Sequence, residues 1–230
     1  MSIPHSLDQD FFKTWTPEMA YVLGYFAADG SMLRNKRGGH FIEFTTTDRC
    51  VLITIKRVCD ASQQLSIRPQ RDEKWKEQYR LQIGSKEWFA DLSSLGFTQA
   101  KSHTLNFPEV PEEVLGHFVR GYFDGDGCIY FNKLKYADRK SKRWVLLTLF
   151  TSGSRPFLES LHRALTPHGV AGGSLVNKER GFELKFSHKD SLALYRLMYD
   201  TSCTTGLYLP RKYKIFHKAI KTLYGNAVVV

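Results

Sequence analysis

A seven-residue pattern occurs twice in this chain of 230 residues and constrains the fold more than any other feature. The pattern is Gly-Tyr-Phe-x-x-Asp-Gly, and it begins at Gly24 and again at Gly121, 97 positions later. Two further pairs of similar segments follow in the same order, beginning at Phe44 and Phe150 and at Arg80 and Glu183. A constant order with slowly changing offsets indicates a duplicated unit whose loops differ in length.

Each copy is predicted to fold as helix, two strands, helix, two strands and helix. Thr16-Pro17-Glu18 is typical of a helix start, with a hydroxyl cap, proline at the first position and an acid in the first turn. Pro111-Glu112-Glu113 opens the second copy similarly. Alternation of apolar and polar residues predicts the strands. We therefore expect an α+β fold of two tandem α-β-β-α-β-β-α units with antiparallel sheets, related by a pseudo-twofold axis, over residues 1–107 and 108–230.

The charge of the chain favours a polyanionic partner. Lys and Arg number 33 against 23 Asp and Glu, which leaves a net charge of +10. No apolar run approaches the ~20 residues of a membrane helix, and the N-terminus does not resemble a signal peptide. Four widely spaced cysteines disfavour a zinc ribbon or a disulfide framework. We expect an intracellular protein, cytoplasmic or organellar, that binds nucleic acid and no membrane.

Strand residues that are predicted to point away from the core are polar and often basic. Two such sheets side by side would form a saddle-like cationic trough for DNA, whereas the alternative is that these are ordinary solvated faces. The predicted contacts on the strands and hairpins are Asn35, Arg37, Arg68, Gln70, Arg80, Gln82, Tyr130, Asn132, Lys178, Glu183 and Lys185. The basic segment 133–143 adds Lys133, Lys135, Arg139 and Lys142.

Small residues four positions apart in both copies predict a close contact between two helices. They are Gly24 with Ala28 and Gly121 with Gly125. Residues at this spacing lie on one face of a helix, and small side chains let two backbones approach. Glycine inside a helix costs about 1 kcal/mol relative to alanine, so its use there favours such packing. We expect the two repeated helices to form the seam between the units.

An aspartate, Asp29 or Asp126, follows each pair of small residues. The next residues, Gly30 and Gly127, are predicted to end the helices in the left-handed conformation. A lone Asp-Gly is usually a turn. Here, however, helix pairing would bring together two carboxylates that each face the negative end of a helix dipole, so we expect a cation between them. Hard oxygen ligands favour Mg²⁺, which together with a cationic trough predicts metal-assisted phosphodiester hydrolysis.

The segments VLGYFAADG at 22–30 and VRGYFDGDG at 119–127 resemble the two signature motifs of the LAGLIDADG homing endonucleases. The duplicated order resembles the single-chain, pseudo-symmetric members of this family over nearly the whole chain. The resemblance implies a monomer without an obligate protein partner that binds a long double-stranded DNA site and cuts both strands. It also implies Mg²⁺, with Mn²⁺ as a substitute and Ca²⁺ supporting binding without turnover.

The resemblance also implies site residues. Its metal-binding acids correspond to Asp29 and Asp126, and its backbone metal contacts to the carbonyls of Ala28 and Gly125. The earlier, non-catalytic acid of the motif corresponds to Asp124.

Three further catalytic positions follow from the same resemblance. A polar residue near the attacking water corresponds to Thr46 and, by the repeat, to Ser152, although the family often has Gln or Asp there. The basic residue beside the active site corresponds to Lys101. The second copy has Cys203 or Thr204 where a lysine is expected, and Lys212 lies nearby but out of register. The basic residue of the second half therefore stays open.

Relatives of this fold suggest other functions. One is an intron-splicing maturase that binds RNA, with or without residual DNA cleavage. Another is a transcription factor without catalytic acids, which the presence of both acids disfavours. No glycine-rich phosphate loop follows a strand, so the sequence also disfavours a kinase or a dinucleotide-dependent oxidoreductase.

Overall fold

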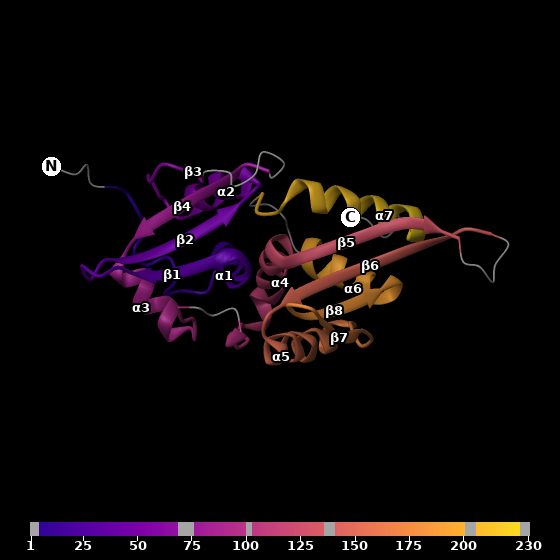
Figure 1. Cartoon of the computed structure of the whole chain (residues 1–230). Coiled ribbons are helices and arrows are strands. Elements are labelled where there is room, and N and C mark those ends of the chain that lie inside the picture. The colour runs from indigo at the N-terminus through magenta and orange to yellow at the C-terminus, as the bar shows by residue number, and fades with distance from the viewer. Residues whose placement is uncertain (1–4, 69–75, 100–102, 136–140, 201–205, 226–230) are drawn as a thin grey trace.

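The protein consists of two similar halves, each with a four-stranded antiparallel sheet that helices cover on one face (Figure 1). The computed structural model describes residues 5–68, 76–99, 103–135, 141–200 and 206–225. The first half contains α1 (Pro17–Asp29), β1 (Gly30–Arg34), β2 (His40–Thr46), α2 (Arg49–Val58), β3 (Ser66–Arg68), β4 (Gln78–Gly84) and α3 (Lys86–Ser94). The second half contains α4 (Glu112–Asp126), β5 (Gly127–Leu134), β6 (Arg143–Ser152), α5 (Arg155–Leu165), η2 (Thr166–His168), β7 (Ser174–Lys178), β8 (Gly181–Ser187), α6 (His188–Tyr199) and α7 (Pro210–Tyr224).

The two sheets have the same strand order, which confirms the duplicated α+β fold. The orders are β1-β2-β4-β3 and β5-β6-β8-β7. Gly30 lies opposite Phe44 in the first sheet, and Gly127 lies opposite Phe150 in the second. The expected alternation also holds, since apolar side chains such as Leu81 are buried under the helices. We call the other face of each sheet, which carries Arg80 and Gln82 in the first half, the open face.

Helix α7 is an element that the sequence analysis did not predict. It follows α6 at the end of the second half and has no equivalent among the described residues of the first half. Pro210 opens the helix, and Phe216, Ala219 and Ile220 bury its inner side. None of the described helices is long and apolar enough to cross a membrane. The predicted boundary at residue 107 falls between α3 and α4 and stays a prediction.

The seam between the halves is the predicted contact between α1 and α4. Thr16 caps α1 by accepting a hydrogen bond from the Met19 amide at 3.1 Å, as its sequence predicts. A β-carbon on Gly24 would lie 2.0 Å from the Phe118 carbonyl oxygen, and one on Gly121 would lie 2.0 Å from the Tyr21 carbonyl oxygen. The two helices therefore run parallel with their backbones in direct contact.

The prediction of left-handed helix ends at Gly30 and Gly127 is wrong. Their φ angles are −84° and −87°, because each residue already begins a strand. Glycine is required at both positions for space instead. A β-carbon would lie 2.0 Å from the ring of Phe26 in the first half and 2.3 Å from the ring of Phe123 in the second.

A buried arginine on α4 attaches the segment that leads to α7. Arg120 donates hydrogen bonds to the carbonyls of Met198 at 2.5 Å and Leu207 at 2.8 Å, and to His117 Nδ1 at 2.8 Å. His117 must be neutral at Nδ1 to accept this bond. Burial, followed by the charge of Arg120, lowers the pKa of His117 to about 4.

Adding one methyl group at the seam should destabilise the protein. Gly24→Ala would place a β-carbon against a backbone carbonyl that cannot rotate away, so we expect a loss of about 1–3 kcal/mol in the free energy of unfolding. Urea denaturation measures this loss. Ala90→Gly on the exposed side of α3 serves as the control for helix propensity, which alone would make Gly24→Ala stabilising by about 1 kcal/mol. A more stable Gly24→Ala protein would contradict the close contact.

Protonation of His117 should destabilise the folded state. Its pKa is lower when folded than when unfolded, so its contribution to stability is complete above pH ~6.5 and is lost as the pH falls toward 4, by up to about 1.4 kcal/mol per pH unit. Asp124 acts in the opposite direction because burial raises its pKa to about 6. The measurement is therefore the difference in unfolding free energy between wild type and His117→Gln. A difference that does not change with pH would contradict a buried neutral His117.

Candidate active site

The two predicted metal-binding aspartates lie at the same end of the seam. Asp29 is the last residue of α1, Asp126 is the last residue of α4, and both are half-buried. A β-carbon on Gly125 would lie 2.3 Å from the Ala28 β-carbon and 3.5 Å from Asp29 Oδ2. The carboxylate of the first half therefore lies against the last turn of the helix from the second half.

The tyrosine of each motif is buried close to the aspartate of its own half. Burial raises the pKa of Tyr25, and the charge of Asp29 raises it further. Burial raises the pKa of Tyr122 in the same way, with further increases from Asp126 and then Asp29. The repeated Gly-Tyr-Phe segment thus contributes a glycine to the seam and a neutral phenol beside the acid.

Thr46 and Ser152, the predicted polar residues near the attacking water, occupy equivalent places at the ends of β2 and β6. Each hydroxyl accepts a hydrogen bond at 3.1 Å from the amide two residues later. Hydrogen bonds from Thr46 and Ser152 also act to lower the pKa values of Tyr25 and Tyr122, respectively. Each of these hydroxyls therefore contacts the buried tyrosine that lies close to the aspartate of its own half.

Lys212 lies near the position where the second copy was expected to have its basic residue, and its side chain is buried at the end of α4. Its three N–H groups are shared among four carbonyls, those of Phe123 at 2.6 Å, Asp124 at 2.8 Å, Gly125 at 3.1 Å and Gly127 at 2.6 Å. The carbonyls of Asp124 and Gly125 belong to the last turn of α4, where an α-helix leaves carbonyls without internal partners. The negative end of the helix dipole and the nearby acids favour a cation there.

The charge state of Lys212 reflects two opposing effects. Burial lowers its pKa to about 8, whereas the charges of Asp124 and Asp29 raise it. Lys212 is therefore mostly protonated at neutral pH. The sequence signal for this residue was the strongly basic helical pattern of 210–224, but nothing in that pattern says which helix end its lysine would meet.

Asp124, the earlier acid of the second motif, is buried and binds the start of α7 through its carboxylate. Its Oδ2 accepts hydrogen bonds from the Tyr21 hydroxyl at 2.9 Å and from the Leu209 amide at 2.7 Å. This buried carboxylate joins α1, α4 and the start of α7. It thereby places Lys212, three residues after Leu209, beneath the last turn of α4.

A second contact joins α7 to the first half. The Arg211 guanidinium binds the Asp48 carboxylate at 2.8 and 2.9 Å in a two-pronged ion pair. The hydrogen bond from Arg211 is the main cause that lowers the pKa of Asp48. Arg211 and Lys212 thus hold opposite sides of the seam.

A cavity of about 280 Å³ extends from Asp126 along the second sheet. Ser152 lines it, as do Lys178 and Arg180 from the β7–β8 hairpin. The structure therefore brings a predicted catalytic acid, a predicted catalytic hydroxyl and a predicted DNA contact to one concave surface.

The open face of the first sheet contains a buried acid that the sequence analysis missed. Glu43 lies between Arg68, with which it forms an ion pair, and Arg80, whose Nη1 is 3.6 Å from Glu43 Oε2. Gln82 also donates to Glu43 at 3.3 Å. Alternation in the FIEFTT segment placed Glu43 on this face and was the available signal.

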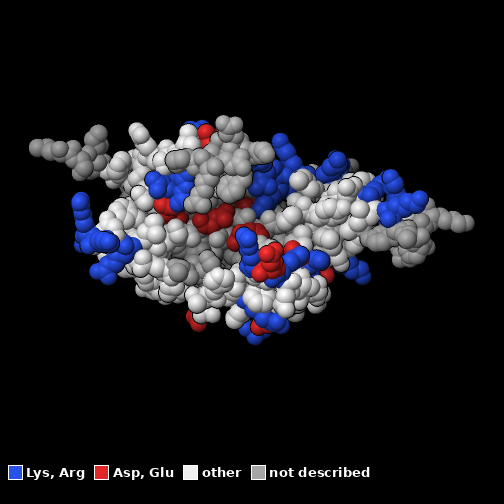
Figure 2. Space-filling model, viewed as in Figure 1, with Lys and Arg blue, Asp and Glu red and all other residues white. Residues whose placement is uncertain are grey.

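The open face of the second sheet shows the same mixture of charges. Glu183 lies 3.2 Å from the ammonium of Lys178 and 3.8 Å from that of Lys185. Figure 2 shows acidic side chains near the middle of this side of the molecule, with Lys and Arg side chains beside them and toward both ends. The expected cationic surface is thus interrupted by carboxylates.

Several predicted DNA contacts lie on the β1–β2 and β5–β6 hairpins. Tyr130 and Asn132 are exposed on the open face. Lys133 differs, because strand alternation places it on the opposite face, where its ammonium lies 4.9 Å from the centre of the Trp144 ring. Asn35 uses its side-chain oxygen within its turn, accepting from the amides of Arg37 at 3.0 Å and Gly39 at 2.7 Å.

The remaining predicted residues divide into two groups. Arg37, Lys135 and Lys142 are exposed, outside the strands. Lys101, Gln70 and Arg139 lie outside the described residues, as do Cys203 and Thr204.

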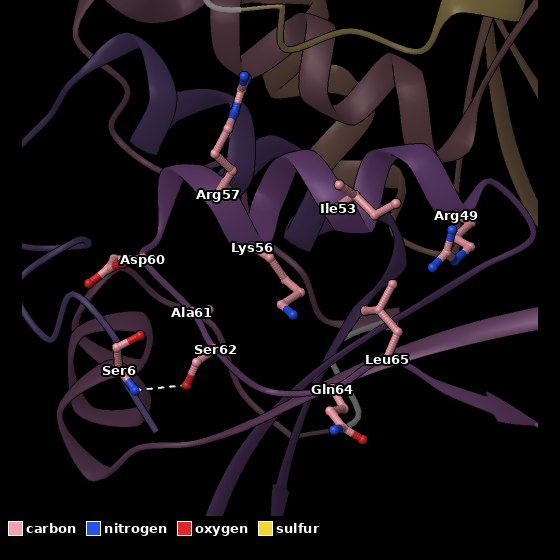
Figure 3. Close-up of a pocket in the computed structure, with 10 residues that line it drawn as sticks. All are labelled: Ser6, Arg49, Ile53, Lys56, Arg57, Asp60, Ala61, Ser62, Gln64 and Leu65. Carbon is pink, nitrogen blue, oxygen red and sulfur yellow. Dashed lines mark hydrogen bonds between the residues drawn. The ribbon is translucent and has the colours of Figure 1, made fainter. Parts of the chain in front are cut away.

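A larger cavity of about 740 Å³ lies on the outer side of α2, and no predicted catalytic residue lines it (Figure 3). Lys56 points into this cavity, whereas Arg57 points away from it. The seam end, where carboxylates, hydroxyls and a buried ammonium converge, is chemically the stronger candidate despite its smaller cavity.

Removal of the Lys212 charge should destabilise the protein. Lys212→Met keeps the length of the side chain but removes the ammonium that donates to the carbonyls at the end of α4, and it leaves Arg120 as the remaining buried positive charge that acts on Asp124. We expect a loss on the order of 3 kcal/mol in unfolding free energy, measured by urea denaturation. Lys214→Met, on the exposed side of the same helix, is the matched control. Equal effects of the two substitutions would contradict the role given to Lys212.

Comparisons with known proteins agree with this geometry. Residues 16–94 match the LAGLIDADG-like domain family. No curated protein is significantly similar to the chain.

Several solved structures share the fold across both halves. The meganuclease I-SmaMI bound to uncleaveable DNA is 14% identical, with 93% of each chain covered and a TM-score of 0.58. The homing endonuclease I-WcaI bound to its DNA recognition sequence is 15% identical, with 90% of this chain and 91% of that chain covered and a TM-score of 0.59. The LAGLIDADG meganuclease I-AabMI bound to uncleaved DNA is 14% identical, with 90% of each chain covered and a TM-score of 0.60. The chain therefore contains a LAGLIDADG-like domain in its first half and has, over both halves, the fold of the LAGLIDADG meganucleases.

Proposed function

We propose that the protein is a site-specific endonuclease that hydrolyses phosphodiester bonds on both strands of a long double-stranded DNA site. The observation that carries this proposal is the convergence of Asp29 and Asp126 at one end of the α1–α4 seam. One motif from each half provides one acid for each strand. Both halves belong to one chain, so we propose that it acts as a monomer without an obligate protein partner, inside the cell.

The open faces of the two sheets are the proposed DNA-binding surface. They lie on either side of the seam end, with basic side chains toward both ends of the molecule (Figures 1 and 2). I-WcaI and I-AabMI, which share the fold, are bound to DNA in their structures, which supports DNA as the ligand of this surface. Tyr130, Asn132, Arg80 and Lys185 are the proposed base contacts, since polar strand residues can reach base edges in a major groove.

The seam end is suited to bind Mg²⁺, for which Mn²⁺ would substitute. Among the described residues no three His, Cys, Asp or Glu side chains cluster as a complete metal site. Mg²⁺ needs fewer protein ligands, because it commonly keeps several waters and binds substrate phosphates together with one or two carboxylates. The proposed ligands are Asp29, Asp126 and the carbonyls of Ala28 and Gly125. That four carbonyls at this end of α4 already bind an ammonium supports the fit to a cation.

When bound, the metal would supply charge stabilisation for the attacking and leaving oxygens. The protein groups would provide the rest. Asp29 and Asp126 would each orient a water molecule toward the phosphodiester, and Thr46 and Ser152 would bind that water or a phosphate oxygen. Lys212 is the proposed basic residue of the second half, and Lys101 that of the first.

Replacing either acid by its amide should abolish double-strand cleavage. Asp29→Asn and Asp126→Asn keep the size of the side chain but remove the charge that would hold the metal. We expect cleavage to fall below about 1% of wild type, a barrier increase of ~2.7 kcal/mol or more, while DNA binding survives. The assay is cleavage of a genomic DNA library with Mg²⁺, followed by sequencing of the ends, with a gel shift in Ca²⁺ for binding.

Asp60→Asn, at the exposed end of α2, is the matched control and should cleave normally. Thermal melting of each variant separates loss of chemistry from loss of fold. Full cutting by either active-site variant would contradict the proposed function. Failure of wild type to cleave any DNA in the library would contradict it as well.

A further inference from the structure

Helix α7 carries a row of lysines that the proposed active site does not use. The helix has 15 residues, and none of them is Asp or Glu. Lys214, Lys218 and Lys221 are exposed and follow each other at intervals of four and three residues. Residues at these intervals share one side of a helix, so the three ammonium groups form a line, which we call the α7 lysine row.

The other sides of α7 are occupied by the rest of the protein. Phe216, Ala219 and Ile220 are buried in the core. His217 shares a hydrogen bond of 2.9 Å with the Tyr195 hydroxyl of α6, and the ring of Tyr213 stacks against the ring of Tyr195. The α7 lysine row lies away from both the core and α6, on a side of the helix that is open to solvent.

The start of α7 lies at the candidate active site. Lys212 binds the last turn of α4, and Arg211 binds Asp48 of the first half. From there the helix runs beside β5, the edge strand of the second sheet (Figure 1). The α7 lysine row therefore begins near the seam and follows the border of the second open face.

The spacing of the row suits a phosphate backbone. Seven residues separate Lys214 from Lys221, a distance of about 10 Å along a helix axis. One strand of B-DNA presents a phosphate every ~3.4 Å of its axis, so this length corresponds to about three phosphates for three lysines. Lysine is a flexible point charge that suits phosphate oxygens, whereas base recognition usually requires fixed, bidentate donors.

We propose that the α7 lysine row binds the phosphates of one strand of the DNA duplex beside the second half of the protein, independently of base sequence. This inference rests on the proposed function, because it assigns a further contact to the same duplex. Its role is to hold the duplex in register over the seam while the open faces read the bases.

The test compares two triple variants that each lose three positive charges. The first is Lys214→Gln, Lys218→Gln and Lys221→Gln. The matched control is Lys86→Gln, Arg163→Gln and Lys189→Gln, all exposed on α3, α5 and α6, which cover the faces of the sheets opposite the open faces. Both variants and wild type should melt at similar temperatures, because every substituted side chain is exposed.

The measurement is the affinity for a labelled DNA duplex of mixed sequence between about 50 and 200 mM salt. Each phosphate contact contributes about 0.9 to the slope of log affinity against log salt. We expect the α7 triple variant to lose roughly 2–3 units of slope and the control variant to lose none. A single-stranded RNA probe is measured in parallel.

Equal slopes for the two triple variants, with duplex binding by wild type intact, would overturn the α7 lysine row and leave the proposed function standing. An effect of the α7 substitutions on RNA binding alone would also overturn it. Absence of salt-dependent duplex binding by wild type would overturn both the row and the proposed function.

Discussion

The backbone contact between α1 and α4 is the constraint on which the rest of the structure depends. Gly24 and Gly121 leave no side chain between the helices, so each α-carbon lies against a carbonyl of the other helix. Each glycine costs about 1 kcal/mol of helix stability, which the close packing must offset. In return, two parallel helices end side by side and bring Asp29 and Asp126 to one place.

This arrangement also concentrates negative charge. Two helix C-termini and two carboxylates meet at the seam end, where helix dipoles disfavour anions. The second half places the Lys212 ammonium there, where it binds carbonyls of the last turn of α4 and the Gly127 carbonyl and interacts with the charge of Asp29. The cation that the sequence predicted at the seam is thus partly provided by the protein itself. A metal ion bound by Gly125 would share that carbonyl with Lys212.

The two halves differ most where α7 attaches. The second motif helix carries a buried polar trio, His117, Arg120 and Asp124, that binds the segment leading to α7. The equivalent positions of α1 are apolar: Ala20, Leu23 and Ala27. A duplicated fold has therefore diverged inside its most similar helices. Burying these polar groups requires that each find a partner, which explains why the trio and α7 occur in the same half.

Local patterns predicted the elements well, because caps and alternation act over a few residues. Thr16 caps α1, and Leu81 and Ile83 point inward as their alternation predicts. The prediction of a left-handed conformation at Gly30 was wrong, because glycine is required there by the nearby ring of Phe26 and not by the turn itself. Lys133 was predicted as a DNA contact but lies on the face opposite the open face, beside Trp144. The reason is that β5 continues, with its alternation, beyond the residues that pack on the core.

The sequence by itself determined the duplicated unit, the close packing of the motif helices and the meeting of two acids at their ends, since all of these follow from residues near each other in the chain or from the repeat. Only the tertiary structure decided which charges meet. Asp48 binds Arg211 from 163 positions away, and Lys212 reaches Gly127 from 85 positions away. Glu43 and Glu183 likewise lie among the cations of the open faces. Such contacts depend on how whole elements pack, and no local pattern of residues encodes them.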